Sequence, residues 1–256
     1  MDIIDAHVHL PTQETCPDLR SKKERLLQEL DENNVSACIA IADSWHKSAI
    51  GSTDELVKLF PETNDPRVYV VGGISPFVSY REDLAKFREH LDNGRIVGIK
   101  LYTGHEHFYL DDERLTEVYE MAQEYDVPVL FHSGWDDPQY GDVDRAAEIV
   151  GKYPALKLIC CHCWYPDINK CMQLTHSPNM FFDLSSVADD AAVFNSISDD
   201  VKKLIETIPD RVMFGSDSFG CSMAEHIRSV NELGLTPEIL QKVMAGNAKR
   251  VYRLKG

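Results

Sequence analysis

The stretch Ile3-Ile4-Asp5-Ala6-His7-Val8-His9 decides the fold of this chain. It is a short apolar run that ends in a His-x-His pair, which is typical of a buried β-strand with polar residues at its end. Alternate side chains of a strand lie on one face, so His7 and His9 are expected to point the same way. Two imidazoles on one rigid edge supply two ligands for a metal ion. Taken alone, such a pair more often marks two polar residues where a strand becomes a loop.

Further apolar runs follow the first at short intervals. They predict strands at residues 35–42, 68–75, 96–101, 128–132, 156–162, 179–185 and 212–217. Amphipathic segments between them predict helices at residues 21–33, 52–60, 79–92, 112–125, 142–152 and 167–176, with a further helical region ending near residue 207. After the last strand we expect a helix at residues 222–233 and another that starts at Thr236-Pro237 and is interrupted at Gly246-Asn247.

Eight strands that alternate with helices predict a parallel sheet. The runs are rich in Val, Ile and Leu, as expected when helices cover both faces of the sheet. The 256 residues suit a closed barrel of eight units. We therefore predict an α/β protein: a single-domain (β/α)8 TIM barrel over residues 1–256, with extra C-terminal helices. An open doubly wound sheet is the alternative, but no Gly-x-Gly-x-x-Gly turn follows the first strand.

Composition and charge exclude several classes of partner. The formal net charge of −16 disfavours binding to nucleic acid or to an anionic membrane surface. No apolar run approaches 18 residues, and the first strand begins by Ile3, so we expect neither a membrane span nor a signal peptide. Seven cysteines, an odd number, suit a reducing compartment, so we expect a cytoplasmic protein. Cys160, Cys161 and Cys163 flank His162, but neighbouring strand residues face opposite ways, so we expect them mostly to pack.

Polar side chains gather at the predicted strand ends: His7, His9, Lys100, His132, His162 and Asp217. In an α/β barrel the carboxyl ends of the strands assemble the active site. A lone histidine, lysine or aspartate at such an end has an ordinary structural explanation. Six of them on one rim would be costly without a metal ion or a substrate to satisfy them.

Several short motifs then resemble one known superfamily. They are Asp5-Ala6-His7-Val8-His9, Gly98-Ile99-Lys100-Leu101-Tyr102, His132-Ser133-Gly134, His162, Gly215-Ser216-Asp217 and Gly246-Asn247-Ala248. Together they resemble the amidohydrolase superfamily over residues 2–254, and most of all its amidohydrolase-related group of metal-dependent hydrolases and non-oxidative decarboxylases. One departure is visible, because His162 lies in Cys-His-Cys-Trp where the resemblance predicts a glycine-rich turn.

The resemblance implies a role for each of these residues. His7, His9, His132 and Asp217 would hold one divalent ion, expected to be zinc. Asp217 would also accept the proton of an activated water and pass it to a leaving group. His162 would polarise or protonate the substrate, or ligate a second ion. Lys100 would remain an unmodified ammonium beside a single ion, although a carbamate bridging two ions is the alternative.

Loop residues near these strand ends leave alternatives open. Trp135 and Trp164 either flank a planar substrate or pack loop against helix. His105 and His107 form a second His-x-His pair, but in a loop this spacing does not fix a common direction. We expect the loop at residues 11–20 to border the pocket.

The sequence leaves four functions to compare. We expect a hydrolase that cleaves a lactone, amide or ester-like bond of a small molecule with metal-activated water. A non-oxidative decarboxylase is the alternative, and no arginine suited to clamping a second carboxylate is evident. A TatD-type deoxyribonuclease resembles the chain less, since it has a glutamate in place of Lys100. An inactive binding barrel disagrees with an intact ligand set. The expected partner is a small molecule, and assembly into a homo-oligomer is left open.

Overall fold

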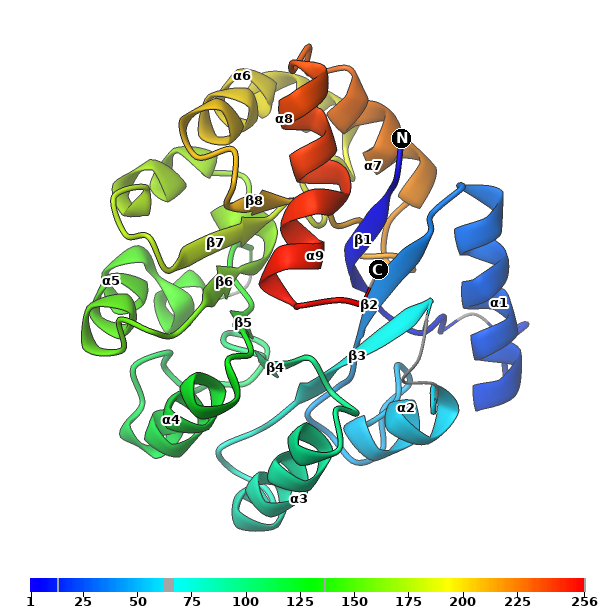
Figure 1. Ribbon diagram of the computed structural model, residues 1–256, viewed down its shortest axis with the longest axis vertical. Helices are drawn as coiled ribbons and strands as arrows, with labels where there is room; N and C mark the ends of the chain where they lie inside the picture. The colour runs from blue at the N-terminus through cyan, green and yellow to red at the C-terminus, as the bar shows by residue number, and fades with distance from the viewer. Residues whose placement is uncertain (13, 62–66, 136, 256) are drawn as a thin grey trace.

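Eight parallel strands form one sheet, in the order β1 to β8, in the computed structural model of the protein (Figure 1). The structure describes residues 1–12, 14–61, 67–135 and 137–255. The sheet closes on itself because the amide of Ala6 donates to the carbonyl of Phe214 (2.9 Å) and that of Asp217 to the carbonyl of His7 (2.8 Å). The predicted single-domain TIM barrel is therefore confirmed.

The strands are short and the helices lie around them. The strands are β1 (Ile4–Val8), β2 (Ala37–Ile41), β3 (Val68–Gly73), β4 (Gly98–Leu101), β5 (Val129–Phe131), β6 (Leu158–Cys160), β7 (Met180–Asp183) and β8 (Val212–Met213). The α-helices are α1 (Leu19–Glu32), α2 (Thr53–Leu59), α3 (Tyr80–Asp92), α4 (Thr116–Tyr125), α5 (Val143–Lys152), α6 (Ala191–Thr207), α7 (Met223–Asn231), α8 (Pro237–Gln241) and α9 (Asn247–Val251). Shorter helical segments are η1 (Glu113–Leu115), η2 (Pro138–Gly141), η3 (Cys161–Trp164), η4 (Ile168–Leu174) and the π-helical η5 (Lys242–Gly246).

Some of the predicted boundaries were wrong. The strands predicted at residues 128–132, 156–162 and 212–217 end earlier, so His132, His162 and Asp217 lie just beyond β5, β6 and β8. Backbone that leaves the sheet can turn a side chain in a direction that strand alternation would not allow. The helix predicted at residues 167–176 is the 3-10 helix η4.

The predicted interruption at Gly246-Asn247 is also wrong. The π-helical turn η5 runs directly into α9, and Gly246 has helical angles (φ −59°, ψ −41°). The side-chain amide of Asn247 donates to the carbonyls of Val212 (2.7 Å) and Pro209 (2.8 Å). The motif therefore ties the last helix to β8 instead of ending it.

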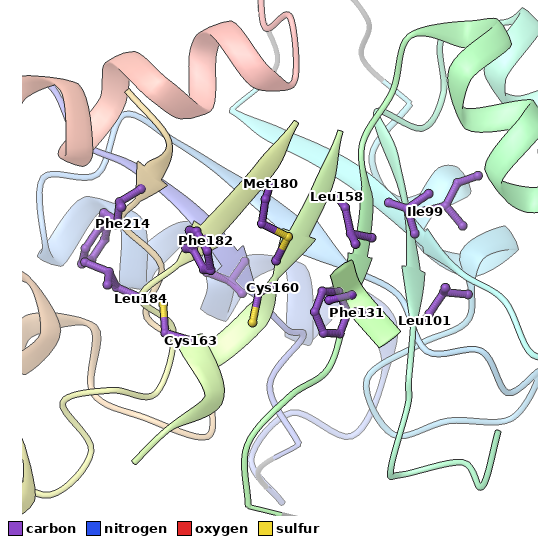
Figure 2. Close-up of a cluster of buried hydrophobic side chains, with 14 of the residues drawn as sticks. Ile99, Leu101, Phe131, Leu158, Cys160, Cys163, Met180, Phe182, Leu184 and Phe214 are labelled. Atoms are coloured by element: carbon purple, nitrogen blue, oxygen red, sulfur yellow. The ribbon is translucent and has the colours of Figure 1, made fainter. Parts of the chain in front are cut away.

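Apolar side chains form two layers, one inside the barrel and one between strands and helices. Figure 2 shows part of the outer layer: Ile99, Leu101, Phe131, Leu158, Cys160, Cys163, Met180, Phe182, Leu184 and Phe214. Ala245, Ala248 and Val251 join the inner cluster, so the helix from α8 to α9 closes the amino-terminal end of the barrel (red in Figure 1). The carboxyl ends of the strands are left for a site. In the described part of the chain, no helix is long and apolar enough to cross a membrane.

Candidate metal centre

A cavity of about 250 Å³ lies at the carboxyl ends of the strands. Its wall contains all six side chains predicted from the sequence: His7, His9, Lys100, His132, His162 and Asp217. Thr12, from the loop predicted at residues 11–20, also lines it, as does Leu10 just before that loop, so the start of the loop borders the pocket. Among the described lining residues there is no arginine.

A larger cavity, of about 360 Å³, lies near the opposite end of the barrel. Arg95, Tyr125 and Arg253 line it, together with the start of β3. Its described lining contains no histidine, cysteine or carboxylate side chain. Of these two cavities, the smaller one is therefore the one equipped for chemistry.

Three potential ligands converge from β1 and the segment after β8. Asp217 Oδ1 lies 3.4 Å from His7 Nε2 and 3.3 Å from His9 Nε2. His7 Nδ1 lies 3.1 Å from Asp183 Oδ2, and His9 Nδ1 lies 3.0 Å from the carbonyl oxygen of Ile41. Because both oxygens can only accept, each Nδ1 carries the proton and donates. Each Nε2 then has a free lone pair, as a metal ligand requires.

The donor atoms of this group fit a divalent ion. The ligand atoms of His7, His9 and Asp217 lie within 4.8 Å of one another. Among the described residues, His7 Nε2 and His132 Nε2 are buried without a hydrogen-bond partner. Leaving such an atom unpaired costs about 1–3 kcal/mol, and coordination to an ion would remove that cost. Imidazole nitrogens with one carboxylate suit zinc and other divalent first-row metals.

A β-bulge turns the two histidines of β1 into the cavity. Ala6 belongs to the apolar cluster inside the barrel, so strict alternation would turn His7 outward. The register of β1 against β2 shifts between Asp5 and Val8, and His7 and His9 both line the cavity. A bulge beside an active site commonly re-aims a side chain in this way. The same-face prediction for the pair holds, although the sequence did not show the bulge.

Asp5 joins β1 to the segment that carries Asp217. Its Oδ1 accepts from the amides of His7 (3.1 Å) and Ser216 (3.0 Å). Complete burial raises the pKa of Asp5 to about 7. Gly215 leaves room for the neighbouring strand, because a Cβ at that position would lie 3.0 Å from His7 Cβ. These contacts hold the two ligand-bearing segments in fixed positions.

Asp183, at the end of β7, orients two of the histidines and was not identified from the sequence. Its Oδ2 accepts from His7 Nδ1, and its Oδ1 accepts from the amides of His162 (3.3 Å) and Ser185 (3.1 Å) and from the Ser185 hydroxyl. Burial alone would raise the pKa of Asp183, but His7 outweighs it and holds this pKa well below the usual range. An ionised carboxylate behind a ligating imidazole increases its basicity. The only sequence signal was a polar residue at the end of the apolar run Met180–Asp183.

His162 is neutral, and contacts with Ser185 orient its ring. Its Nδ1 lies 2.8 Å from Ser185 Oγ and 3.2 Å from the Ser185 carbonyl. Because the Ser185 hydroxyl donates to Asp183, the proton lies on His162 Nδ1 and Nε2 is a lone pair. Burial lowers the pKa of His162 to about 3. This state suits accepting a proton or ligating an ion, so the protonating role implied by the resemblance requires His162 to gain a proton first.

The turn after β6 takes the place of a glycine-rich one. His162, Cys163 and Trp164 have φ values of 65°, 52° and 52°, a left-handed region that non-glycine residues seldom occupy. This turn lets Cys161 lie in the inner apolar cluster while the next residue, His162, lines the cavity. Cys163 packs outside the barrel, so the expectation that these cysteines mostly pack is in line with the structure (Figure 2).

Lys100 lies buried at the base of the cavity. Its Nζ donates to Cys161 Sγ at 3.0 Å and lies 5.4 Å from the ring centroid of Tyr102. Cys161 Sγ also forms a possible ligand group with His7 and Asp183. Burial raises the pKa of the Cys161 thiol well above its usual value. Within that group, Asp183 accepts from His7 Nδ1 and so supports the His7 ring.

Asp217 is ionised, and one of its carboxylate oxygens accepts a hydrogen bond from a serine hydroxyl. The Ser186 hydroxyl donates to its Oδ2 at 2.6 Å, so Oδ1 is the oxygen that faces His7 and His9. Burial would raise the pKa of Asp217, but the neighbouring imidazoles of His9 and His7 outweigh it and hold this pKa well below the usual range. Ser186 was not identified from the sequence, because nothing local distinguishes it from other loop serines.

Trp135 and Trp164 lie in different surroundings. Trp164 is buried, and its Nε1 donates to the carbonyl of Gly141 at 2.8 Å, so it packs loop against helix. Trp135 is 43% exposed, and its ring centroid lies 5.3 Å from that of His162. Of the two, only Trp135 lies beside a histidine that lines the cavity.

The two histidines of the second His-x-His pair lie in different surroundings. His105 lines the cavity, with its ring centroid 4.1 Å from that of His132. His107 stacks on Tyr140 at 5.2 Å and lies 3.3 Å from Asp137 Oδ2. The expectation that loop spacing sets no common direction is therefore confirmed.

Comparisons with known proteins agree with this architecture. Residues 4–254 match the family model described as Amidohydrolase. An uncharacterized TIM-barrel protein from Bordetella bronchiseptica has a TM-score of 0.78 at 20% identity, with 99% of each chain covered. A probable 2-pyrone-4,6-dicarboxylic acid hydrolase from Acinetobacter baumannii, with citric acid bound, has a TM-score of 0.71 at 13% identity, with 99% of this chain and 100% of that chain covered.

A third structure of this fold carries a metal ion. It is a dihydroxybenzoic acid decarboxylase from Polaromonas sp. JS666 with bound manganese and the inhibitor 2-nitroresorcinol, with a TM-score of 0.70 at 17% identity, covering 99% of this chain and 97% of that one. No protein with a curated description matches the chain in sequence. At these identities the structures show a shared fold and nothing finer.

Proposed function

The chain belongs to the amidohydrolase family, and we propose that it is a metal-dependent hydrolase that cleaves a lactone, amide or ester-like bond of a small molecule. The observation that carries the proposal is the convergence of His7 Nε2, His9 Nε2 and Asp217 Oδ1 in one cavity, with both imidazoles fixed in the ligand tautomer. Ligands arranged in this way with an adjoining cavity leave space for water and substrate.

The proposed ligands of the ion are His7, His9, His132 and Asp217. We propose that the site binds one ion and that the ion is zinc. The manganese bound in the structurally similar decarboxylase supports a divalent ion in a barrel of this fold. When bound, the ion would act as a Lewis acid and lower the pKa of a coordinated water toward about 7. His132 Nε2, buried without a partner among the described residues, supports the assignment of the fourth ligand.

The chain's own residues supply the remaining steps. Asp217 is ionised, so it can take a proton from the attacking water and pass it to the leaving group. His162, neutral with a lone pair on Nε2, is suited to accept a hydrogen bond from the water or from a hydroxyl of the substrate. Lys100 would hold a substrate carboxylate or the oxyanion that develops during attack.

Decarboxylation without oxidation is the second candidate. The similar fold of the dihydroxybenzoic acid decarboxylase favours it, because the same kind of barrel performs that reaction. In that case Lys100 would bind the carboxylate that is lost, and no water would attack the substrate. The lack of an arginine among the described lining residues leaves no clamp for a second carboxylate, which favours the hydrolase.

Isotope labelling separates the two reactions. The zinc-loaded or manganese-loaded protein is incubated with lactones, amides, esters and aromatic acids in ¹⁸O-labelled water, and products are analysed by mass spectrometry. Hydrolysis places ¹⁸O in the acid product, and Asp217→Asn protein serves as the control for background hydrolysis. Release of carbon dioxide without ¹⁸O in the remaining product would overturn the hydrolase assignment in favour of the decarboxylase.

A further inference from the structure

The loop after β4 brings an imidazole into the cavity that the proposed mechanism does not use. The His105 ring centroid lies 4.1 Å from that of His132 and 6.2 Å from that of Tyr102. β4 and β8 are four positions apart in a closed sheet of eight strands. His105 therefore lies across the barrel from the segment that carries Asp217.

A buried carboxylate fixes this loop. Glu106 is only 8% exposed; its Oε1 accepts from the Ser44 hydroxyl at 2.5 Å and its Oε2 from the Ser75 hydroxyl. Ser44 follows β2 and Ser75 follows β3, so one side chain joins three consecutive loops at the mouth of the barrel. Within the loop, the amide of Glu106 donates to the carbonyl of Tyr102 at 2.8 Å.

The same loop is also joined to β5. The Thr103 hydroxyl donates to the carbonyl of His132 at 2.6 Å. This hydrogen bond joins the loop that carries His105 to the segment just after β5 that carries His132. A loop held in place before binding loses little freedom when a ligand arrives, which is the usual requirement for a recognition site.

We propose that His105 is a substrate-contacting residue that, with Lys100, receives a carboxylate of the substrate, and that Glu106 is the positioning residue for it. This inference rests on the proposed function, in which Lys100 supplies a positive charge. Lys100 and His105 lie in one segment, with the Tyr102 ring near both. Lys100 supplies charge and His105 supplies a directional N–H donor, so the β4 side of the cavity binds the substrate carboxylate beside an ion held from β1, β5 and β8.

The proposed ion already has four ligands in His7, His9, His132 and Asp217, so we assign His105 to the substrate. The loop also contains its own control, because His107 has the same residue type two positions away but a side chain that is 67% exposed.

Binding of benzoate to the zinc-loaded protein tests the proposal, with benzamide as an uncharged analogue of the same shape. Isothermal titration measures both affinities for the wild type and for His105→Ala, His105→Gln, His107→Ala and Glu106→Ala. The zinc content of each protein is measured by mass spectrometry. The wild type is expected to bind benzoate more tightly than benzamide.

The variants distinguish direct contact with the bound ligand from a merely structural role. His105→Ala is expected to weaken benzoate binding about tenfold, the effect of one hydrogen bond to a charged group, with benzamide binding and zinc content unchanged. His105→Gln keeps an N–H donor and should recover part of the loss, whereas His107→Ala should match the wild type. Glu106→Ala should lower benzoate affinity selectively, while a merely structural role would weaken both ligands equally.

Three results would overturn the inference: benzoate affinity in His105→Ala within twofold of wild type, a loss of zinc in that variant, or a wild type that does not prefer benzoate to benzamide. Because no bond is broken in this experiment, its outcome is independent of the ¹⁸O result. A protein that fails the hydrolase test can still bind benzoate through His105, and the reverse also holds.

Discussion

Replacing Asp183 by asparagine should weaken metal binding without removing any ligand. The Asp183 carboxylate accepts the Nδ1 proton of His7 at 3.1 Å. In Asp183→Asn the side-chain oxygen can stay with the amides of Ser185 and His162, and the NH2 group then faces His7. A donor opposite Nδ1 favours the other tautomer of His7, with its proton on Nε2, the nitrogen proposed to bind the ion. Metal binding must then displace that proton.

The size of the effect follows from these contacts. Loss of a carboxylate behind a ligating histidine typically weakens metal affinity about 10- to 100-fold, which is roughly 1.4–2.8 kcal/mol. The folded state also loses hydrogen bonds to a charged group, each worth about 1.5–3 kcal/mol. For a chain of this length, about 1.5–3 kcal/mol lowers the melting temperature by roughly 3–12 °C. The variant should therefore fold, but bind zinc more weakly.

The assay is a competition titration of the metal-free protein with zinc against a chromophoric chelator, with circular dichroism to monitor the fold. Asp83→Asn is the matched control, because Asp83 is also a buried aspartate but does not line the cavity. Its zinc affinity should equal that of the wild type. If natively folded Asp183→Asn protein binds zinc within twofold of wild type, the orienting role of Asp183 is refuted.

Three other predictions concern the proposed ligands and Lys100. His7→Ala combined with His9→Ala should abolish bound metal in elemental analysis while circular dichroism stays native-like, and a full equivalent of metal in the double variant would contradict the site. Asp217→Asn should reduce turnover by at least the roughly 10²-fold expected for loss of a general base, so near wild-type turnover would remove that role. Native mass spectrometry should find one ion per chain and an unmodified Lys100. Two ions with a carbon dioxide adduct would show a carbamate instead and would make His162 a ligand.

The barrel could be predicted from the sequence because its strands are covered on both faces. Continuous apolar runs such as the one containing Ile39 and Ile41 mark such strands, and their regular alternation with helices leaves few topologies. The cavity followed from the same reasoning, since a barrel brings all carboxyl strand ends to one rim. His132 and Asp217 therefore could be placed beside His7 without knowledge of any contact between them.

The orienting residues could not be predicted, because their roles depend on partners far away in the sequence. Asp183 contacts a histidine 176 positions earlier, and Ser186 contacts a carboxylate 31 positions later. No local pattern indicates either pairing. His105 was undecided for a related reason: a loop has no periodicity, and this loop is held by hydrogen bonds from the serines of two other loops to Glu106.

Several points where local rules fail lie around the same cavity, although left-handed non-glycine residues also occur elsewhere, at Asn34, Ser79, Asp126 and Arg253. Alternation fails at His7, where a bulge re-aims the ring, and again at His162, which begins a run of three left-handed residues. Asp217 is also left-handed, with φ 63°, and Asp183 is ionised although fully buried. Sequences that specify a stable fold break such rules mainly where function requires it. A bulge, a run of three left-handed residues and a buried ionised carboxylate meet at this one rim, and together they support the proposal that the rim binds an ion and a substrate.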